Sequence, residues 1–181
     1  MLNACVDDLL KIDGCILAGG AIRDIIIGKQ PKDYDFFFTN ELAVAQALFL
    51  MKNHKSTGNI YTHTYDTPDG DIQLITKSIF ESTRHIIDAF DFTPIQLAYD
   101  GKTLEVGAKT LDDIQNRKVG VNVITKPFAS LERLERYIGT TNSNGVLIDG
   151  WNITDTYKYI LDIMYTQPPG TILGAKRYDF E

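Results

Sequence analysis

The chain has 181 residues, of which 44% are hydrophobic, and carries a formal net charge of -6. This length and apolar content suit one folded domain, or a compact domain with a small appendage, and exclude a disordered chain. The negative charge excludes a global positive field that holds nucleic acid without specificity, so any contact with a polynucleotide needs a local basic patch.

Two features of the sequence bear on where the protein works. The two cysteines, Cys5 and Cys15, have no metal-ligand spacing and are too few for a disulfide framework. We expect no secretion signal, because the first residues lack a basic segment followed by an apolar run, and no membrane span, because no run of about 18 apolar residues occurs. The sequence therefore predicts a cytoplasmic protein with reduced thiols, and it indicates nothing about oligomeric state.

The first part of the chain alternates between helical and extended patterns. The predicted elements are a helix over 2–11, a buried strand over 15–18, a short buried helix over 21–27 and an aromatic-rich strand over 33–38. The strand at 15–18 ends at Gly19 and Gly20, and Gly28 stands where the following helix should stop. A glycine bend is therefore expected between the first strand and the second helix.

The rest of the chain reads as hairpins and helices in turn. The predicted elements are a helix over 40–53, a hairpin of 58–66 with 70–76, a helix over 78–88, a hairpin within 95–106, and helices over 110–117, from Pro127, and over 154–165, the last closed by Pro168 and Pro169. Thr39 or Asn40 is expected to cap the first of these helices, and Ser78 with Glu81 forms a capping box for the second. Asp100–Gly101 is the strongest turn signal of the chain.

This order of elements predicts an α/β (α+β) fold. We expect a mixed β-sheet with flanking helices over 1–125, followed by a short C-terminal helical segment and tail over 126–181.

Two aspartates open the strand at 33–38. Side chains two residues apart on a strand project to the same face, so Asp33 and Asp35 point together, about 6.6 Å apart at their Cα atoms. Two such carboxylates repel each other unless a positive charge lies between them, and their hard oxygen ligands favour Mg²⁺, with Mn²⁺ as the alternative. A lone Asp-x-Asp pair is, however, more often a solvated sheet edge than a metal site.

The glycine bend about a dozen residues earlier favours the metal site. A strand that ends in Gly19 and Gly20 and passes directly into a helix presents free N–H groups and a helix dipole, which attract phosphate. Neither glycine carries a side chain that hinders a close anion. The bend and the acid pair together predict a site for a nucleoside triphosphate with its metal.

The segment GGAIRDIIIGKQPKDYDFFF, residues 19–38, resembles the head-domain signature of the nucleotidyltransferase superfamily that includes DNA polymerase beta. It is most similar to the bacterial-type CCA-adding enzymes and poly(A) polymerases, whose pattern is Gly-Gly-x-Val-Arg-Asp, an apolar run, Gly, then Lys-Asp-x-Asp-Phe. Every fixed position of that pattern is filled except Val, which Ile22 replaces. The segment at 1–125 is then head-like, and the extension that follows is neck-like.

The resemblance continues at lower strength from Gly14 to Tyr137. DFTPIQLAYD, residues 91–100, resembles the family's Arg-Arg-Asp-Phe-Thr-x-Asn-Ala-Leu-Ala-Tyr segment. Three family positions differ, since Ala89 and Phe90 replace the arginines and Ile95 replaces the Asn. LERLERY, residues 131–137, resembles the family's Arg-x-x-Arg-Phe helix.

The resemblance implies a role for each matching residue. Asp33 and Asp35 would be catalytic and hold two magnesium ions, while the expected nucleotide-binding residues are Gly19, Gly20, Arg23, Asp24, Asp91, Arg133 and Arg136. Family members place a third carboxylate on a neighbouring strand, for which Asp71 is our choice and Gln73 the alternative. Glu132 and Glu135 alternate with the two helical arginines, so plain surface ion pairs remain the competing interpretation of those arginines.

Two hypotheses follow for the function. The first is a metal-dependent nucleotidyltransferase that moves a nucleoside monophosphate from an NTP such as ATP to a hydroxyl of an RNA 3′ end, a small molecule or a protein. The second is a nucleotide-binding or interaction module that kept the fold and lost the reaction, as the departures at Ala89, Phe90, Ile95 and Gln73 suggest. Addition of CCA to tRNA is disfavoured by the acidic balance, and a short enzyme of a phage or mobile element suits the chain better.

Overall fold

The computed structural model describes residues 4–141, 147–148 and 150–166. The strands are β1 (Cys15–Ala18), β2 (Asp33–Phe38), β3 (Ser56–Asn59), β4 (Thr62–Tyr65), β5 (Asp71–Ile79), β6 (Leu97–Tyr99), β7 (Leu104–Val106), β8 (Thr140–Thr141) and β9 (Leu147–Ile148). The helices are α1 (Ala4–Leu9), α2 (Gly20–Ile26), α3 (Glu41–Met51), α4 (Thr83–Asp88), α5 (Thr110–Gln115), α6 (Pro127–Glu135) and α7 (Thr154–Thr166), with one 3-10 turn, η1, at Thr93–Ile95.

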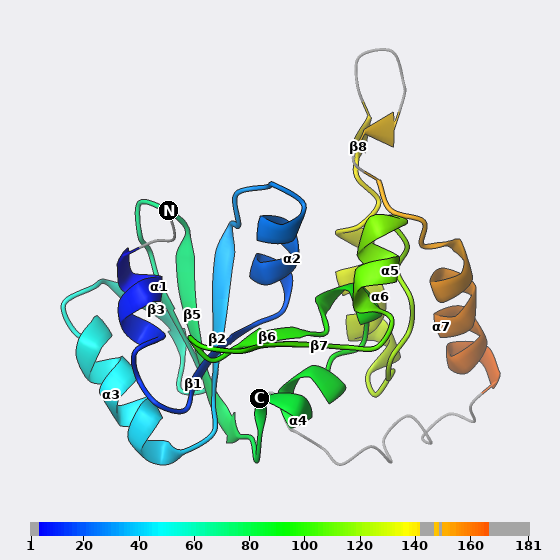
Figure 1. Ribbon diagram of the computed structural model, residues 1–181. Helices are drawn as coiled ribbons and strands as arrows, with labels where there is room; N and C mark the ends of the chain where they lie inside the picture. The colour runs from blue at the N-terminus through cyan, green and yellow to red at the C-terminus, as the bar shows by residue number, and fades with distance from the viewer. Residues whose placement is uncertain (1–3, 142–146, 149, 167–181) are drawn as a thin grey trace.

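One mixed sheet organises the described part of the chain. Its strands lie in the order β3-β4-β5-β2-β1-β6-β7, and β8 pairs separately with β9. β2 and β5 run parallel, whereas the other neighbouring pairs in this sheet are antiparallel. Helices α1 and α3 lie at one end of the molecule, and α5, α6 and α7 lie at the other (Figure 1). Buried residues of all these helices and of α2 belong to one hydrophobic cluster with β2, whereas those of α4 belong to a second cluster with Ile16 and Ala18 of β1. The predicted α+β fold with a mixed sheet and flanking helices is confirmed.

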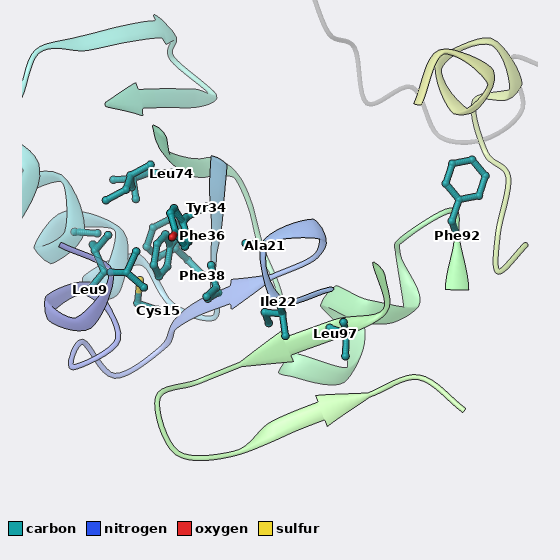
Figure 2. Close-up of a cluster of buried hydrophobic side chains, with 14 of the residues drawn as sticks. Leu9, Cys15, Ala21, Ile22, Tyr34, Phe36, Phe38, Leu74, Phe92 and Leu97 are labelled. Atoms are coloured by element: carbon teal, nitrogen blue, oxygen red, sulfur yellow. The ribbon is translucent and has the colours of Figure 1, made fainter. Parts of the chain in front are cut away.

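The central strand β2 separates the core from the polar face of the sheet. Tyr34, Phe36 and Phe38 are buried, while Asp33 and Asp35 alternate with them and are half-buried. Figure 2 shows the three rings gathered with Leu9, Cys15 and Leu74 in one hydrophobic cluster. Alternation along a single strand thus produces an apolar core face and an acidic face.

The first four predicted elements are confirmed, with one difference in burial. α2 ends just before Gly28, which has φ of 75°, as expected for a residue that closes a helix. Only Ala21 and Ile22 of this helix are buried, whereas Ile25 and Ile26 are 43% and 44% exposed. The prediction of a short buried helix was therefore wrong for one face of α2, which the described elements leave exposed.

The capping box predicted at Ser78 and Glu81 is also wrong. Ser78 lies inside β5, which continues to pair with β2 up to Ile79, and the N–H of Phe80 donates to the carbonyl of Phe38 at 2.9 Å. The helix begins later, at Thr83, and its cap is Ser82, whose hydroxyl accepts from the N–H of His85. Pairing in the sheet outweighed a favourable local capping pattern.

A further hairpin divides the segment that was predicted as the strand 58–66. β3 turns into β4 at Asn59, whose side-chain oxygen accepts from the N–H groups of Tyr61 and Thr62. An Asn whose side-chain oxygen accepts a hydrogen bond from the backbone N–H two residues later is typical of a turn. The sequence therefore contained a signal for this hairpin. The predicted hairpin of β4 with β5 is confirmed.

The remaining predicted elements agree with the structure. Asn40, not Thr39, caps α3 by accepting from the N–H of Ala43 at 2.8 Å. The β6–β7 hairpin, α5, α6 starting at Pro127, and α7 are all present, whereas Pro168 and Pro169 lie outside the described residues.

The C-terminal segment packs onto the rest of the molecule. Leu134, Tyr137, Trp151 and Ile160 belong to the same hydrophobic cluster as the rings of β2. The division at residue 125 remains a prediction, and across the described residues no helix is both long and apolar enough to cross a membrane.

Candidate functional site

The glycine bend and the acid pair lie at the same end of two neighbouring inner strands, β1 and β2. β1 and β2 are antiparallel, with Ala18 opposite Asp35, so the chain turns at Gly19 beside the end of β2 that carries both aspartates. Helix α2, which begins at Gly20, then packs against β2. The structure therefore brings together the two features that the sequence singled out.

Asp71 and Gln73 stand beside the acid pair on the parallel strand β5. The register places Asp71 opposite Asp33 and Gln73 opposite Asp35. Residues in register on parallel strands project to the same face, so all four side chains lie on the acidic face of the sheet. Both candidates for the third acidic position are thus adjacent to the pair, each beside a different aspartate.

The charge at Asp35 is not fully compensated. Burial and, to a smaller extent, the nearby Asp33 raise the pKa of Asp35 to about 7, against the opposing effect of the positive charge of Arg136. Two carboxylates that repel each other in a partly desolvated place are stabilised by a cation. The acid pair therefore has the chemistry of an incomplete cation site.

The protein atoms alone do not complete that site. In the described ranges, no group of three or more His, Cys, Asp or Glu side chains is arranged to hold a metal ion. Mg²⁺ is commonly held by one or two carboxylates together with substrate phosphates and water, so a pair of aspartates suits it when a triphosphate supplies further oxygens. Asp33 and Asp35 fit a metal that arrives with its nucleotide.

The bend itself has a backbone that requires glycine. Gly19 has φ of 87°, and its N–H donates to the carbonyl of Leu97 at 2.8 Å. A Cβ at Gly19 would lie 3.6 Å from the ring of Phe90, which is ordinary contact. Since that N–H is already engaged, the first turn of α2, which starts at Gly20, supplies the N–H groups that lack a partner inside the helix.

Arg23 and Asp24 form a pair at the other end of this first turn. Nε and Nη2 of Arg23 donate to Oδ1 of Asp24 at 2.8 and 2.6 Å, and Nη1 donates to the hydroxyl of Tyr137 at 2.9 Å. Burial works to lower the pKa of Arg23, but Tyr137 and Asp24 outweigh it and the pKa is raised. The guanidinium is therefore a fixed cation held by two neighbours.

Asp91 and Arg133 meet as an ion pair. Nε of Arg133 donates to Oδ2 of the buried Asp91 at 2.7 Å, and Nη2 lies 2.6 Å from the same oxygen. Arg133 pairs in the described part of the chain with this distant carboxylate and not with the glutamates of its own helix. The exposed Arg136 acts electrostatically on Asp35, so the two arginines, three residues apart, serve different acids.

Three aromatic residues near the site were not singled out by sequence reasoning. Tyr137 and Trp151 face Arg23, and Phe90 lies beside Gly19 and against the ring of Phe37. Phe90 was noted only as a departure from the family pattern, and Tyr137 only as the end of a helix motif. No local signal in the sequence points to Trp151, since it reaches the site through tertiary packing.

The sequence model of a protein family described as "Gabija anti-defense 2 family protein" matches residues 1–117. No curated protein sequence matches the chain. The family match spans β1, the glycine bend, both aspartates and the paired strand β5.

Solved structures share the fold. A tRNA-processing enzyme in an apo form is 23% identical with a TM-score of 0.53, covering 72% of this chain and 41% of its own. The CCA-adding enzyme of Thermotoga maritima, in complex with tRNA, is 17% identical with a TM-score of 0.57, covering 74% and 36%. A CCA-adding enzyme in complex with CTP is 15% identical with a TM-score of 0.58, covering 76% and 38%.

These similarities establish the fold of the molecule. The chain has the head fold of the tRNA-processing and CCA-adding enzymes, which confirms the resemblance found in the sequence. It spans about two fifths of the length of these structures. The activity, substrates and partners of those longer proteins are not carried over by the fold.

Proposed function

The chain belongs to the Gabija anti-defense 2 family, and we propose that it acts there as a nucleotidyltransferase, moving a nucleoside monophosphate from an NTP to an acceptor hydroxyl. The observation that carries this proposal is the meeting of the glycine bend with Asp33 and Asp35, where burial and Asp33 raise the pKa of Asp35 to about 7. An acid pair in this state suits a ligand that brings both a cation and phosphates.

Different residues of the site would bind the metal and the phosphates. Asp33 and Asp35 would hold Mg²⁺, with Mn²⁺ as the alternative, and the metal when bound neutralises phosphate charge. The first turn of α2, beginning at Gly20, presents N–H groups and the positive end of its dipole to the phosphates. Catalysis then rests on position and charge more than on covalent chemistry.

The reaction joins an acceptor oxygen to the α-phosphorus. A new O–P bond forms, the bond to the β-phosphate oxygen breaks, and pyrophosphate leaves with the electron pair. The proton of the acceptor hydroxyl passes to water or to a carboxylate, for which Asp71 beside Asp33 is the candidate. If Gln73 instead occupies the equivalent place, beside Asp35, it positions the acceptor without taking the proton.

The family description indicates what the reaction is for. A protein named for anti-defence against Gabija would use nucleotide transfer to disable a component of that defence, so a defence protein or its nucleic acid is the acceptor to examine first. RNA remains an acceptor candidate because the fold is shared with tRNA-processing enzymes. The net charge of -6 favours an acceptor that is not a long polyanion.

The position of Phe90 favours a second function, that of a binding module without transferase activity. Phe90, with Ala89 beside it, stands where the pattern of the CCA-adding enzymes and poly(A) polymerases has arginines, and its ring packs on Phe37 and beside Gly19. An apolar ring at a place expected to carry positive charge suits a module that binds a nucleotide or a partner without transferring.

Incubation with each labelled NTP and Mg²⁺, with cellular RNA or a cell lysate as the acceptor source, distinguishes the two functions. The enzyme transfers label, and the Asp33→Asn and Asp35→Asn variants do not. A folded wild-type protein that binds NTP but transfers no label to any acceptor would leave the binding module as the function.

A further inference from the structure

The guanidinium of Arg23 is already engaged by the protein. Three of its five N–H donors bond to Asp24 and to the hydroxyl of Tyr137. Its flat group also lies over two aromatic rings, at 5.2 Å from the ring centre of Tyr137 and 5.9 Å from that of Trp151. These partners fix the guanidinium in one place. An arginine that moves to contact a bound ligand is usually held by fewer protein groups.

The two rings come from the C-terminal segment, far away in the sequence. Tyr137 follows α6, and Trp151 donates its backbone N–H to the carbonyl of Tyr137 at 2.9 Å. The rings also pack edge to face, with centres 5.4 Å apart. Tyr137 and Trp151 therefore form one unit, which we name the aromatic pair.

A second arginine also contacts the aromatic pair. Arg117 lies over the ring of Trp151 at 5.5 Å, and the N–H of Asn152 donates to the carbonyl of Arg117 at 2.6 Å. The buried Nη1 of Arg117 has no hydrogen-bond partner in the described part of the chain. Two arginines therefore contact one indole, and the segment that follows α5 helps to position it.

Arg23 reaches from this pair back to the glycine bend. Its Nη2 lies 3.5 Å from the place that a Cβ on Gly20 would occupy, so the guanidinium folds over the first residue of α2. Any displacement of the aromatic pair is thus transmitted to the turn that is proposed to receive phosphate.

We propose that Arg23 is a positioning residue that ties the glycine bend to the aromatic pair, so that the C-terminal segment sets the geometry of the phosphate-binding turn. The functional part of this inference rests on the proposed nucleotidyltransferase function. The alternative role of Arg23, a direct contact with phosphate, was the expectation from the sequence. The two roles differ in whether Tyr137 and Trp151 matter to the bend.

Amide hydrogen exchange without nucleotide tests the coupling by itself. The full chain is compared with Tyr137→Phe, which removes only a hydroxyl, and with Arg23→Lys, which keeps the charge but loses the planar fork. We expect exchange at Gly19, whose N–H donates to the carbonyl of Leu97, to accelerate about fivefold in Tyr137→Phe and more in Arg23→Lys, because local opening of the bend becomes easier. Arg84→Gln, which breaks the exposed pair with Asp88 on α4, is the matched control and should leave exchange at Gly19 unchanged.

The sole tryptophan of the chain gives a second readout. Tyr137→Phe and Arg23→Lys should shift its emission, since both alter the surroundings of Trp151, whereas Arg84→Gln should not. Trp151→Phe keeps an aromatic ring beside Arg23 and should protect the amide of Gly19 from exchange far better than Trp151→Leu. Such rescue by a conservative variant is not expected of an arginine that only binds phosphate.

Nucleotide affinity separates this proposal from the proposed function. A positioning role predicts that Tyr137→Phe weakens binding of a magnesium triphosphate several-fold although its hydroxyl touches no phosphate. The proposal is overturned if exchange at Gly19 is the same in wild type, Tyr137→Phe and Trp151→Leu. Faster exchange in these variants, in a protein that binds no triphosphate, supports the coupling and removes the nucleotidyltransferase function instead.

Discussion

The two faces of β2 carry opposite chemistry on consecutive residues. Tyr34, Phe36 and Phe38 are almost fully buried in the hydrophobic cluster, while Asp33 and Asp35 are half-buried on the opposite face, at the end of β2 that lies beside the glycine bend. The apolar face stabilises the molecule by removing large rings from water. The acidic face does the reverse, since Asp33 and burial raise the pKa of Asp35 to about 7. Burial of the three rings therefore offsets the unfavourable proximity of the Asp33 and Asp35 carboxylates on the same strand.

This contrast explains why the candidate site lies at the centre of the sheet. A central strand is fixed on both sides by hydrogen bonds, here to β1 and β5, so its side chains have well-defined positions. Two repelling carboxylates stay in place only if their backbone is rigid. Substitutions on the two faces should accordingly have opposite effects on stability.

The largest effect is expected on the apolar face, from Phe36→Ala. Phe36 is fully buried, so its truncation leaves a cavity and should lower the free energy of unfolding by about 3–5 kcal/mol. Urea denaturation followed by circular dichroism measures this change. Phe49→Ala on α3 is the matched control, because Phe49 is 69% exposed and should cost less than about 1 kcal/mol. Equal costs at the two positions would mean that Phe36 is not part of the core.

The adjacent residue should respond in the opposite direction. The folded-state pKa of Asp35, about 7, lies above its ordinary value of 3.8, so its stabilising contribution is complete below pH 3.8 and is lost as the pH rises through 7. In the absence of metal, Asp35→Asn should therefore stabilise the protein above pH 7, by at most about 4 kcal/mol because residual solvent contact screens the charges. The gain should vanish near pH 4.

Thermal unfolding in a metal chelator at pH 4 and pH 8 checks this prediction. Asp100→Asn is a suitable comparison, because hydrogen bonds from the backbone of Thr103 and Lys102 lower the pKa of Asp100 and the substitution should destabilise. An Asp35→Asn variant that is less stable than wild type at pH 8 without metal would show that the acidic face is not repulsive.

Gly19→Ala tests the bend that faces the acids. Gly19 has φ of 87°, which L residues rarely adopt, so the substitution should cost about 1–2 kcal/mol even though the new Cβ meets Phe90 at an ordinary distance of 3.6 Å. The same melting assay measures it. Gly28→Ala is the control, because Gly28 also has a positive φ but an added Cβ there would meet no atom within 4 Å. This variant therefore measures the cost of backbone strain alone. If only Gly19→Ala also weakens triphosphate binding, the bend has a role beyond local strain.

The smallest effect is expected at a cap of a helix that covers the apolar face. The side chain of Asn40 accepts from the N–H of Ala43 at the start of α3, and Asn40→Ala should cost about 1 kcal/mol. Asn40→Asp retains an acceptor and should lie within a few tenths of a kcal/mol of wild type. A loss with Asp equal to that with Ala would show that the cap is not the source of the effect.

Much of this arrangement was predictable from local patterns. The alternation of β2, the glycine bend and the cap at Asn40 each depend on neighbours within a few residues, so the sequence expresses them directly. The meeting of bend and acids was also expected, because the strands are short and adjacent along the chain. The fold was further indicated by the family signature at residues 19–38, which the similar structures confirm.

The features that the sequence did not show involve, in three cases, contacts between distant segments. Ser78 follows a good capping pattern, yet β5 continues past it because pairing with β2 is available. Arg23 contacts Tyr137 and Trp151, which come from more than 100 residues away. Asp91 and Arg133 form an ion pair across the chain. The nucleotide-binding roles expected of Arg23, Asp91 and Arg133 remain predictions. Local sequence patterns cannot show which residues far apart in the chain will contact each other.

The central claim is that Asp33 and Asp35 together hold a metal and a triphosphate against the glycine bend. Isothermal titration of each NTP, with and without Mg²⁺, into wild type and into Asp33→Asn/Asp35→Asn tests it most directly. The account predicts binding of at least one triphosphate that requires Mg²⁺ in the wild type and is lost in the double variant, while the variant remains folded. Binding that is equal in the two proteins, or no binding of any triphosphate by the wild type, would contradict it.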